Sequence, residues 1–194
     1  MDGTVKNIVD VALFETPNSW SWCRIRDFAQ VKGGKRLPKG TSFSDTITSH
    51  GYIRVVVMKN NTIIQNDLKY IDDEVYEMIK NYTISSNDLY VTIAGSIGVV
   101  GEIPELNNGM NLTENAAKIT QISINKSFVC LVLQSDFVQK QFRFKTFQVA
   151  MPKLALERIL TTFIPVPPME EQERIVNTVK LYFKSLENMK KSLE

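Results

Sequence analysis

The sequence predicts an α+β fold, with a domain of short strands and short helices over residues 1–167 and one long helix over residues 168–194. Two observations lead to this prediction. Several segments rich in β-branched or alternating apolar residues are separated by Gly, Pro and Asn turns, which is typical of strands. The C-terminal residues instead repeat apolar side chains at steps of three and four, which indicates a helix.

The predicted strands are bounded by residues that favour turns. Asn60-Asn61 and the stretch from Gly95 to Gly98 are predicted turns, and the glycines and proline of residues 32–40 predict a loop. The expected strands span residues 20–28, 52–58, 89–94, 98–103 and 116–122.

Two short helices are expected, over residues 73–80 and 154–160, and prolines keep residues 163–168 extended. The segment 128–144 is ambiguous from its residues alone. Val129 and Leu131 favour a strand in its first half, whereas the second half favours a helix.

The C-terminal helix carries a narrow apolar seam. Pro168 suits the first turn of a helix, and the acidic Glu170 and Glu171 suit its positive end. Apolar residues then recur at alternating steps of four and three, as in a coiled coil. The seam residues are Ile175, Val179, Tyr182, Leu186, Met189 and Leu193. The alternative is an amphipathic helix that lies on its own domain.

Charge is distributed unevenly along the 194 residues, although the net charge is only +2. Six basic residues and one acidic residue lie between Arg24 and Lys39, and five basic residues and one acidic residue lie between Phe137 and Arg158. Residues 67–77 are acidic. A one-sided basic surface of this kind suits a polyanion such as DNA. The alternative is a solvated face with scattered charge.

Side chains that commonly perform catalysis are few. Cys23 and Cys130 lie in apolar surroundings, and together with the single histidine, His50, they give no zinc-ligand spacing. Asp67-Leu68-Lys69, with Asp45 upstream, weakly resembles a nuclease metal site but lacks supporting glutamates. We therefore expect no catalytic site, no metal and no cofactor. The N-terminus lacks the layout of a signal peptide and no apolar run reaches roughly 18 residues, so we expect a cytoplasmic protein.

Four stretches, in this order, resemble type I restriction–modification specificity subunits. They are Phe14-Glu15-Thr16-Pro17-Asn18-Ser19-Trp20-Ser21-Trp22-Cys23-Arg24-Ile25, then Gly34-Lys35-Arg36-Leu37-Pro38-Lys39-Gly40, then Ala94-Gly95-Ser96-Ile97-Gly98 with Asn111-Leu112-Thr113-Glu114-Asn115-Ala116-Ala117-Lys118, and finally Pro152–Ile159 running into Ile164–Val176. The junction Ile-Pro-x-Pro-Pro-x-x-Glu-Gln-x-x-Ile-Val is the most specific of them. Full-length members carry two recognition domains and two helices, whereas this sequence carries one of each and therefore resembles a half-length form.

The resemblance implies a target recognition domain with a strongly bent mixed sheet, a mostly helical segment over 128–144, and a spacer helix that pairs antiparallel with a partner helix. It also implies a non-catalytic protein that reads double-stranded DNA and directs methyltransferase and restriction subunits to a bipartite site. A lone half is then expected to form a homodimer or to pair with another half-subunit through the C-terminal helix.

The loop at residues 34–40 holds the first candidates for DNA contact. Its glycines allow the backbone to approach a phosphate, and Arg36 is suited to bind guanine through two hydrogen bonds. Lys35 and Lys39 are candidates beside it, and Arg54 and Lys145 are secondary candidates.

Other interpretations remain open at this point. The nearest is the recognition fragment of a combined restriction–methylation enzyme. Two further classes are a hydrolase or nuclease built on Asp67 and Lys69, and a coiled-coil adaptor that does not bind DNA. The adaptor predicts no salt-dependent affinity for DNA.

Overall fold

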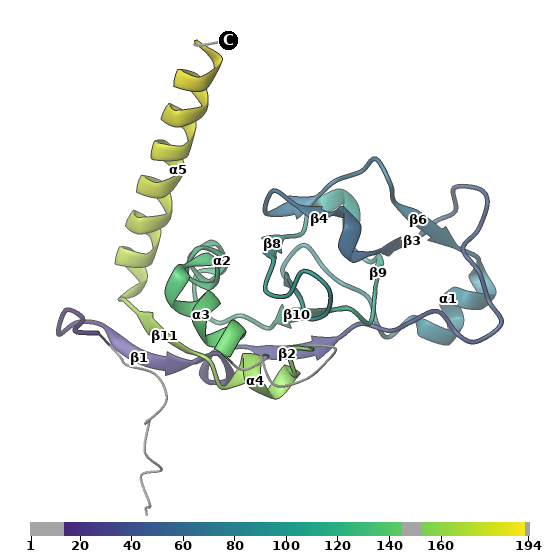
Figure 1. Cartoon of the computed structure of the whole chain (residues 1–194), viewed down its shortest axis with the longest axis horizontal. Coiled ribbons are helices and arrows are strands. Elements are labelled where there is room, and N and C mark those ends of the chain that lie inside the picture. Colours follow the sequence, from purple (N-terminus) through teal and green to yellow (C-terminus); the bar gives the residue numbers. More distant parts are fainter. Residues whose placement is uncertain (1–13, 145–152, 193–194) are drawn as a thin grey trace, which may run out of the picture.

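A head of short strands and helices carries one projecting helix in the computed structural model, which describes residues 14–144 and 153–192 (Figure 1). The strands are β1 (Ser21–Arg24), β2 (Gln30–Gly33), β3 (His50–Ile53), β4 (Met58–Lys59), β5 (Thr62–Ile63), β6 (Lys69–Ile71), β7 (Leu89–Thr92), β8 (Val100–Glu102), β9 (Asn111–Leu112), β10 (Ala116–Thr120) and β11 (Phe163–Val166). The α-helices are α1 (Asp73–Ile79), α2 (Lys126–Gln134), α3 (Asp136–Phe144), α4 (Leu156–Leu160) and α5 (Met169–Lys191). Among the described residues, no helix is both long enough and apolar enough to span a membrane.

The strands form small sheets rather than one continuous layer. The largest has the order β2-β10-β7-β8 with antiparallel neighbours, and a second sheet has the order β6-β3-β9. β1 pairs with β11, which brings the start of the described chain beside the segment that leads into α5. The mixed α+β fold is therefore confirmed, and the strong bend of the sheet stays a prediction.

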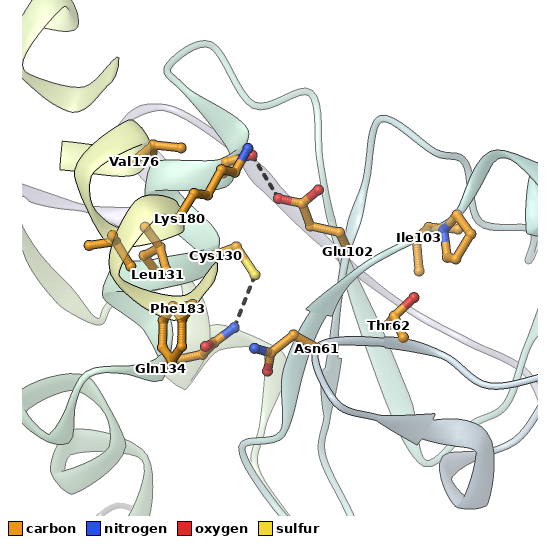
Figure 2. A pocket seen from close by; sticks show the side chains of 13 residues that line it. Asn61, Thr62, Glu102, Ile103, Cys130, Leu131, Gln134, Val176, Lys180 and Phe183 are labelled. Carbon is orange, nitrogen blue, oxygen red and sulfur yellow. Dashed lines mark hydrogen bonds between the residues drawn. The ribbon is translucent and has the colours of Figure 1, made fainter. Parts of the chain in front are cut away.

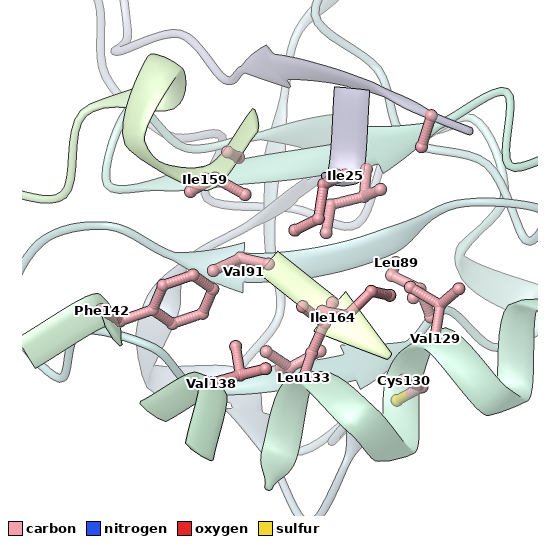
Figure 3. Packing of buried hydrophobic residues seen from close by; sticks show 14 of the residues in the cluster. Ile25, Leu89, Val91, Val129, Cys130, Leu133, Val138, Phe142, Ile159 and Ile164 are labelled. Carbon is pink, nitrogen blue, oxygen red and sulfur yellow. The ribbon is translucent and has the colours of Figure 1, made fainter. Parts of the chain in front are cut away.

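The main core lies between the four-stranded sheet and helices α2, α3 and α4 (Figure 3). Val91 from β7 and Ile164 from β11 meet Leu133 from α2 and Phe142 from α3 in this cluster, and each is fully buried. A residue of this size stabilises the fold by about 1.5–3 kcal/mol when it leaves water.

The ambiguous segment 128–144 is helical, as the family resemblance implied. The strand preference of its first half was wrong, because Asn125 caps the helix and Ser135 separates α2 from α3. The Asn125 side chain accepts a hydrogen bond from the Phe128 N–H at 3.0 Å. Val129 and Leu133, four residues apart, then bury one face of α2.

Two predicted strands are shorter than expected, and both end in a 3-10 turn. The strand at 20–28 ends at Arg24, where the Asp27 carboxylate accepts the Arg24 backbone N–H at 2.6 Å. The strand at 52–58 is interrupted by a turn over Val55–Val57. The predicted turn at Asn60-Asn61 joins β4 to β5, and both asparagines adopt positive φ angles.

Candidate nucleic-acid interface

The basic loop after β2 is pinned at its base to β9 and β10. Gly34 donates its N–H to the Ala116 carbonyl at 3.0 Å, and Lys35 donates to the Leu112 carbonyl at 2.8 Å. A Cβ at position 34 would overlap the carbonyl oxygens of Leu112 and Thr113, so only glycine permits this approach. The loop therefore starts from a rigid base.

A second anchor fixes the far side of the loop. Leu37 and Phe43 pack against a cluster that includes Tyr52 and Ile71, and the Tyr52 hydroxyl donates to the Lys35 carbonyl at 2.6 Å. Burial raises the pKa of Tyr52, so this hydroxyl keeps its proton. Three predicted DNA-contact residues, Lys35, Arg36 and Lys39, are exposed on the loop between these anchors.

Arg36 is held by a carboxylate that our sequence analysis had not singled out as a site residue. Its Nε donates to Glu114 Oε1 at 2.7 Å, while the Arg36 side chain stays 77% exposed. The Thr113 hydroxyl donates to the other oxygen of Glu114 at 2.9 Å. Partial burial of Glu114 works to raise its pKa, but the hydrogen bonds from Arg36 and Thr113 outweigh it, so the pKa is lowered.

The other predicted DNA-contact residues differ in the partners that their side chains have within the protein. The Lys35 Nζ lies 5.5 Å from the centre of the Tyr82 ring, in cation–π range. The Arg54 Nη2 donates to the Asp67 carboxylate at 2.7 Å and to its carbonyl at 3.1 Å, so Arg54 is held by the acidic segment. Lys145 lies outside the described residues.

The residues considered for metal binding or catalysis have other roles in the structure. Asp67 pairs with Arg54, and no group of three or more potential metal ligands occurs in residues 14–144 and 153–192. His50 stacks on Tyr76 at 3.8 Å, and its Nε2 lies 3.0 Å from Asp73. Burial raises the pKa of Cys130 to about 12, which leaves its thiol protonated and poorly nucleophilic at neutral pH.

Three of the four stretches that carried the resemblance meet beside Glu114. The Asn115 carbonyl accepts hydrogen bonds from Ile93 at 2.8 Å and from Ala94 at 3.2 Å. Lys153 donates its Nζ to the Glu114 carbonyl at 3.4 Å. Residues far apart in the sequence thus build one support beneath the basic loop.

The C-terminal helix is fixed to the head at its first two turns. Gln172 and Val176 are buried, and α5 contacts α2 there. Beyond this contact lies a groove of about 370 Å³ between α2, α5 and β8, lined in part by Cys130, Leu131 and Phe183 (Figure 2). The helix then leaves the head, as Figure 1 shows.

The outer half of α5 exposes the predicted seam. Ile175 and Val179 are half-buried near the head, but Tyr182, Leu186 and Met189 are 69%, 57% and 54% exposed. The long helix is confirmed, and it does not lie flat on its own head. Leu193, the last seam residue, lies outside the described residues.

Comparison with known proteins identifies the family. The family model for the type I restriction modification DNA specificity domain matches residues 17–194. The EcoBI specificity subunit of Escherichia coli, a type I restriction enzyme subunit, is 29% identical over 143 residues, covering 73% of this chain and 30% of that protein. The EcoAI specificity subunit of Escherichia coli is 22% identical over 180 residues, covering 84% of this chain and 28% of that protein. The chain thus spans less than a third of the length of these curated relatives.

Solved structures share the fold at low sequence identity. A chain from a type I R-M system, solved in work on complex assembly and conformational transition, has a TM-score of 0.73 at 14% identity and covers 92% of this chain and 42% of that chain. The HsdS subunit from Thermoanaerobacter tengcongensis has a TM-score of 0.65 at 14% identity and covers 92% of this chain and 41% of that chain. With the family model matched over nearly the whole chain, this protein belongs to the type I restriction–modification DNA specificity family.

Proposed function

We propose that the chain is a half-length specificity subunit, whose head reads one half of a bipartite sequence in double-stranded DNA. The observation that carries this proposal is the exposed basic loop of Lys35, Arg36 and Lys39, held on a rigid base in a domain of the specificity family. Rigid positioning favours sequence reading, because base contacts need side chains placed accurately in a groove.

The basic residues divide into two roles in this proposal. Arg36 contacts a base edge, since a guanidinium matches the two acceptors of guanine in the major groove. Lys35 and Lys39 contact phosphates, which position the protein without carrying sequence information. Arg54 and Lys145 are secondary contacts, and Arg54 would have to exchange its partner Asp67 for DNA.

In this proposal the chain divides into a recognition domain at residues 1–167 and a spacer segment at residues 168–194, which contains α5 (Met169–Lys191). A second α5 running antiparallel places Tyr182 of one helix opposite Leu186 of the other, and Val179 opposite Met189. The acidic start of α5, Glu170 and Glu171, then lies toward the basic end of the partner helix. A homodimer made in this way reads two copies of one half-site across a fixed gap, and another half-subunit in its place gives two different half-sites.

Methyltransferase and restriction subunits supply the chemistry in this proposal, and the chain itself acts without catalysis in the cytoplasm. The family membership supports this role, because the curated relatives are specificity subunits of type I restriction enzymes.

Methylation mapping tests the proposal directly. The chain is expressed with its cognate modification subunit in cells that lack other methyltransferases, and methylated positions are located across the genome. We expect methylation within one bipartite motif that disappears when the chain is omitted. A pattern that is the same with and without the chain contradicts the proposal. Salt-independent or absent binding of the pure chain to duplex DNA supports the adaptor interpretation instead.

A further inference from the structure

An acidic side chain lies within the basic surface that we assign to DNA. Glu114 Oε1 accepts the Arg36 Nε–H at 2.7 Å, and Glu114 is the less exposed partner, at 23% against 77% for Arg36. A carboxylate in this position repels DNA phosphates and thus opposes DNA binding. We therefore expect Glu114 to have a role that offsets this cost.

Glu114 is itself held in place by other residues, which makes it a fixed partner for the exposed Arg36 side chain. The Thr113 hydroxyl donates to its second oxygen at 2.9 Å, and Lys153 donates to its backbone carbonyl at 3.4 Å. The carbonyl of the next residue, Asn115, accepts hydrogen bonds from the backbone N–H groups of Ile93 and Ala94, which directly follow β7. The fixed carboxylate therefore orients the guanidinium of Arg36. Without this contact, an exposed arginine side chain would have no fixed orientation.

The contact uses only one side of the guanidinium. Within the part of the chain that the structure describes, the two terminal nitrogens of Arg36 make no hydrogen bond. Those two nitrogens are the pair that can donate together to O6 and N7 of guanine. A carboxylate on Nε orients this end of the fork while it leaves both donors free.

We propose that Glu114 is a positioning residue for base recognition, which orients Arg36 toward a guanine and weakens its attraction to phosphates. The proposal rests on the proposed function, since it takes the loop as the DNA-reading element. The negative charge offsets part of the positive charge of Arg36, so a phosphate gains less from this arginine than from an unpaired one. The attraction between Arg36 and the edge of a guanine, which is neutral, is reduced less.

Three substitutions of Glu114 separate the alignment of Arg36 from the effect of the negative charge. Glu114→Gln keeps an oxygen that accepts from Nε and removes the charge. Glu114→Asp keeps the charge on a side chain about 1.5 Å shorter, so it loses the contact. Glu114→Ala removes both. Arg36→Ala identifies the base pair concerned, and Glu157→Gln is the control, because Glu157 faces Arg26 at 3.8 Å in another exposed pair.

The probe is a library of random-sequence DNA duplexes, from which each variant selects its preferred sequences. Affinity for the unselected library is measured at about 50 and 200 mM salt. Thermal melts show that each variant is folded. We expect Arg36→Ala to lose preference at one base pair by about fivefold or more. Glu114→Ala and Glu114→Asp should lose it at the same base pair.

Glu114→Gln should keep the preference and bind the unselected library more tightly, with a salt slope steeper by up to about 0.9. The Glu157→Gln control should match the wild type in both measurements. If the wild type selects a sequence and Glu114→Ala and Glu114→Asp keep the preference that Arg36→Ala loses, the positioning role is overturned and the proposed function stands. If the wild type selects no sequence, the proposed function fails and the positioning role fails with it.

Discussion

The Gln172 side chain accepts a hydrogen bond from the Asn125 backbone N–H at 3.0 Å and donates to the Pro167 carbonyl at 2.8 Å. This one carboxamide joins the start of α5 to the residue that caps α2, and it is 2% exposed. Gln172 belongs to the junction motif that identified the family in the sequence. The contact explains the motif physically, because it fixes the direction in which α5 leaves the head.

Replacing Gln172 should loosen this junction. Gln172→Met keeps the volume but leaves the Asn125 N–H and the Pro167 carbonyl without their partner. We expect a loss of about 1–3 kcal/mol in the free energy of unfolding, measured by urea denaturation. The neighbouring Glu173→Ala, at an exposed position, is the control and should stay close to the wild type. Equal stability of all three proteins contradicts the assignment.

The seam predicts how the chain associates. Leu186→Lys places a charge in the centre of the helix pair and should convert a dimer into a monomer, as seen by sedimentation velocity. Leu181→Lys is the matched control, because Leu181 is exposed to a similar degree, 66% against 57%, but lies outside the seam. Loss of the dimer in both variants, or in neither, is inconsistent with the seam as the interface.

Two neighbouring glycines at the base of the basic loop should differ in their tolerance of substitution by alanine. Gly34→Ala forces the loop away from the Leu112 and Thr113 carbonyls and should cost about 1–3 kcal/mol of stability. Gly33→Ala meets only the Leu156 side chain at 3.6 Å, an ordinary contact. Thermal melts of the two variants should therefore differ clearly, and Gly33→Ala should resemble the wild type.

Base contacts and phosphate contacts should respond differently to mutation. Arg36→Ala is expected to cost about 1–3 kcal/mol of binding to the selected site and less to other duplexes. Lys39→Ala should weaken binding to all duplexes alike and reduce the salt slope by about one. Fluorescence anisotropy titrations at several salt concentrations measure both effects. Uniform weakening by Arg36→Ala would assign it to a phosphate instead.

The lowered pKa of Glu114 predicts a difference in acid stability between the wild type and Glu114→Gln. Because the folded pKa lies below the ordinary value of 4.5, the ionised pair stabilises the fold above that value. This contribution is lost as the pH falls through the folded pKa. The melting temperature of the wild type should thus fall more than that of the variant on going from neutral pH to below about pH 4.5. Parallel curves would show that the pair contributes nothing to folding.

Periodicity and turn residues were enough to predict part of the fold, whereas strands β2, β5, β6 and β9 were not among the expected ones. The C-terminal helix, the helix after Asp72 and the turn at Asn60-Asn61 were all correct, because each depends on residues close together in the sequence. The β-branched residues of segment 128–144 left its first half ambiguous, whereas in the structure Asn125 caps α2 and the helix buries one face in the main core. Propensity for a strand is a weak preference that tertiary packing overrides.

The candidate site was only partly predictable. The loop at residues 34–40 could be singled out from its charges, and the structure places Lys35, Arg36 and Lys39 on its exposed side. Glu114 lies 78 positions from Arg36, so no local pattern connects them. The only signal was that both residues lie in stretches that resemble the specificity family.

The solvent exposure of the outer turns of α5 affects the stability of that part of the helix. Residues 181–192 are all exposed, and an isolated helix segment of this length is marginal in water. Order in these turns should therefore be linked to self-association by mass action, with amide hydrogen exchange there slowing as the protein concentration rises. The head, which buries its own core, should exchange at a rate independent of concentration.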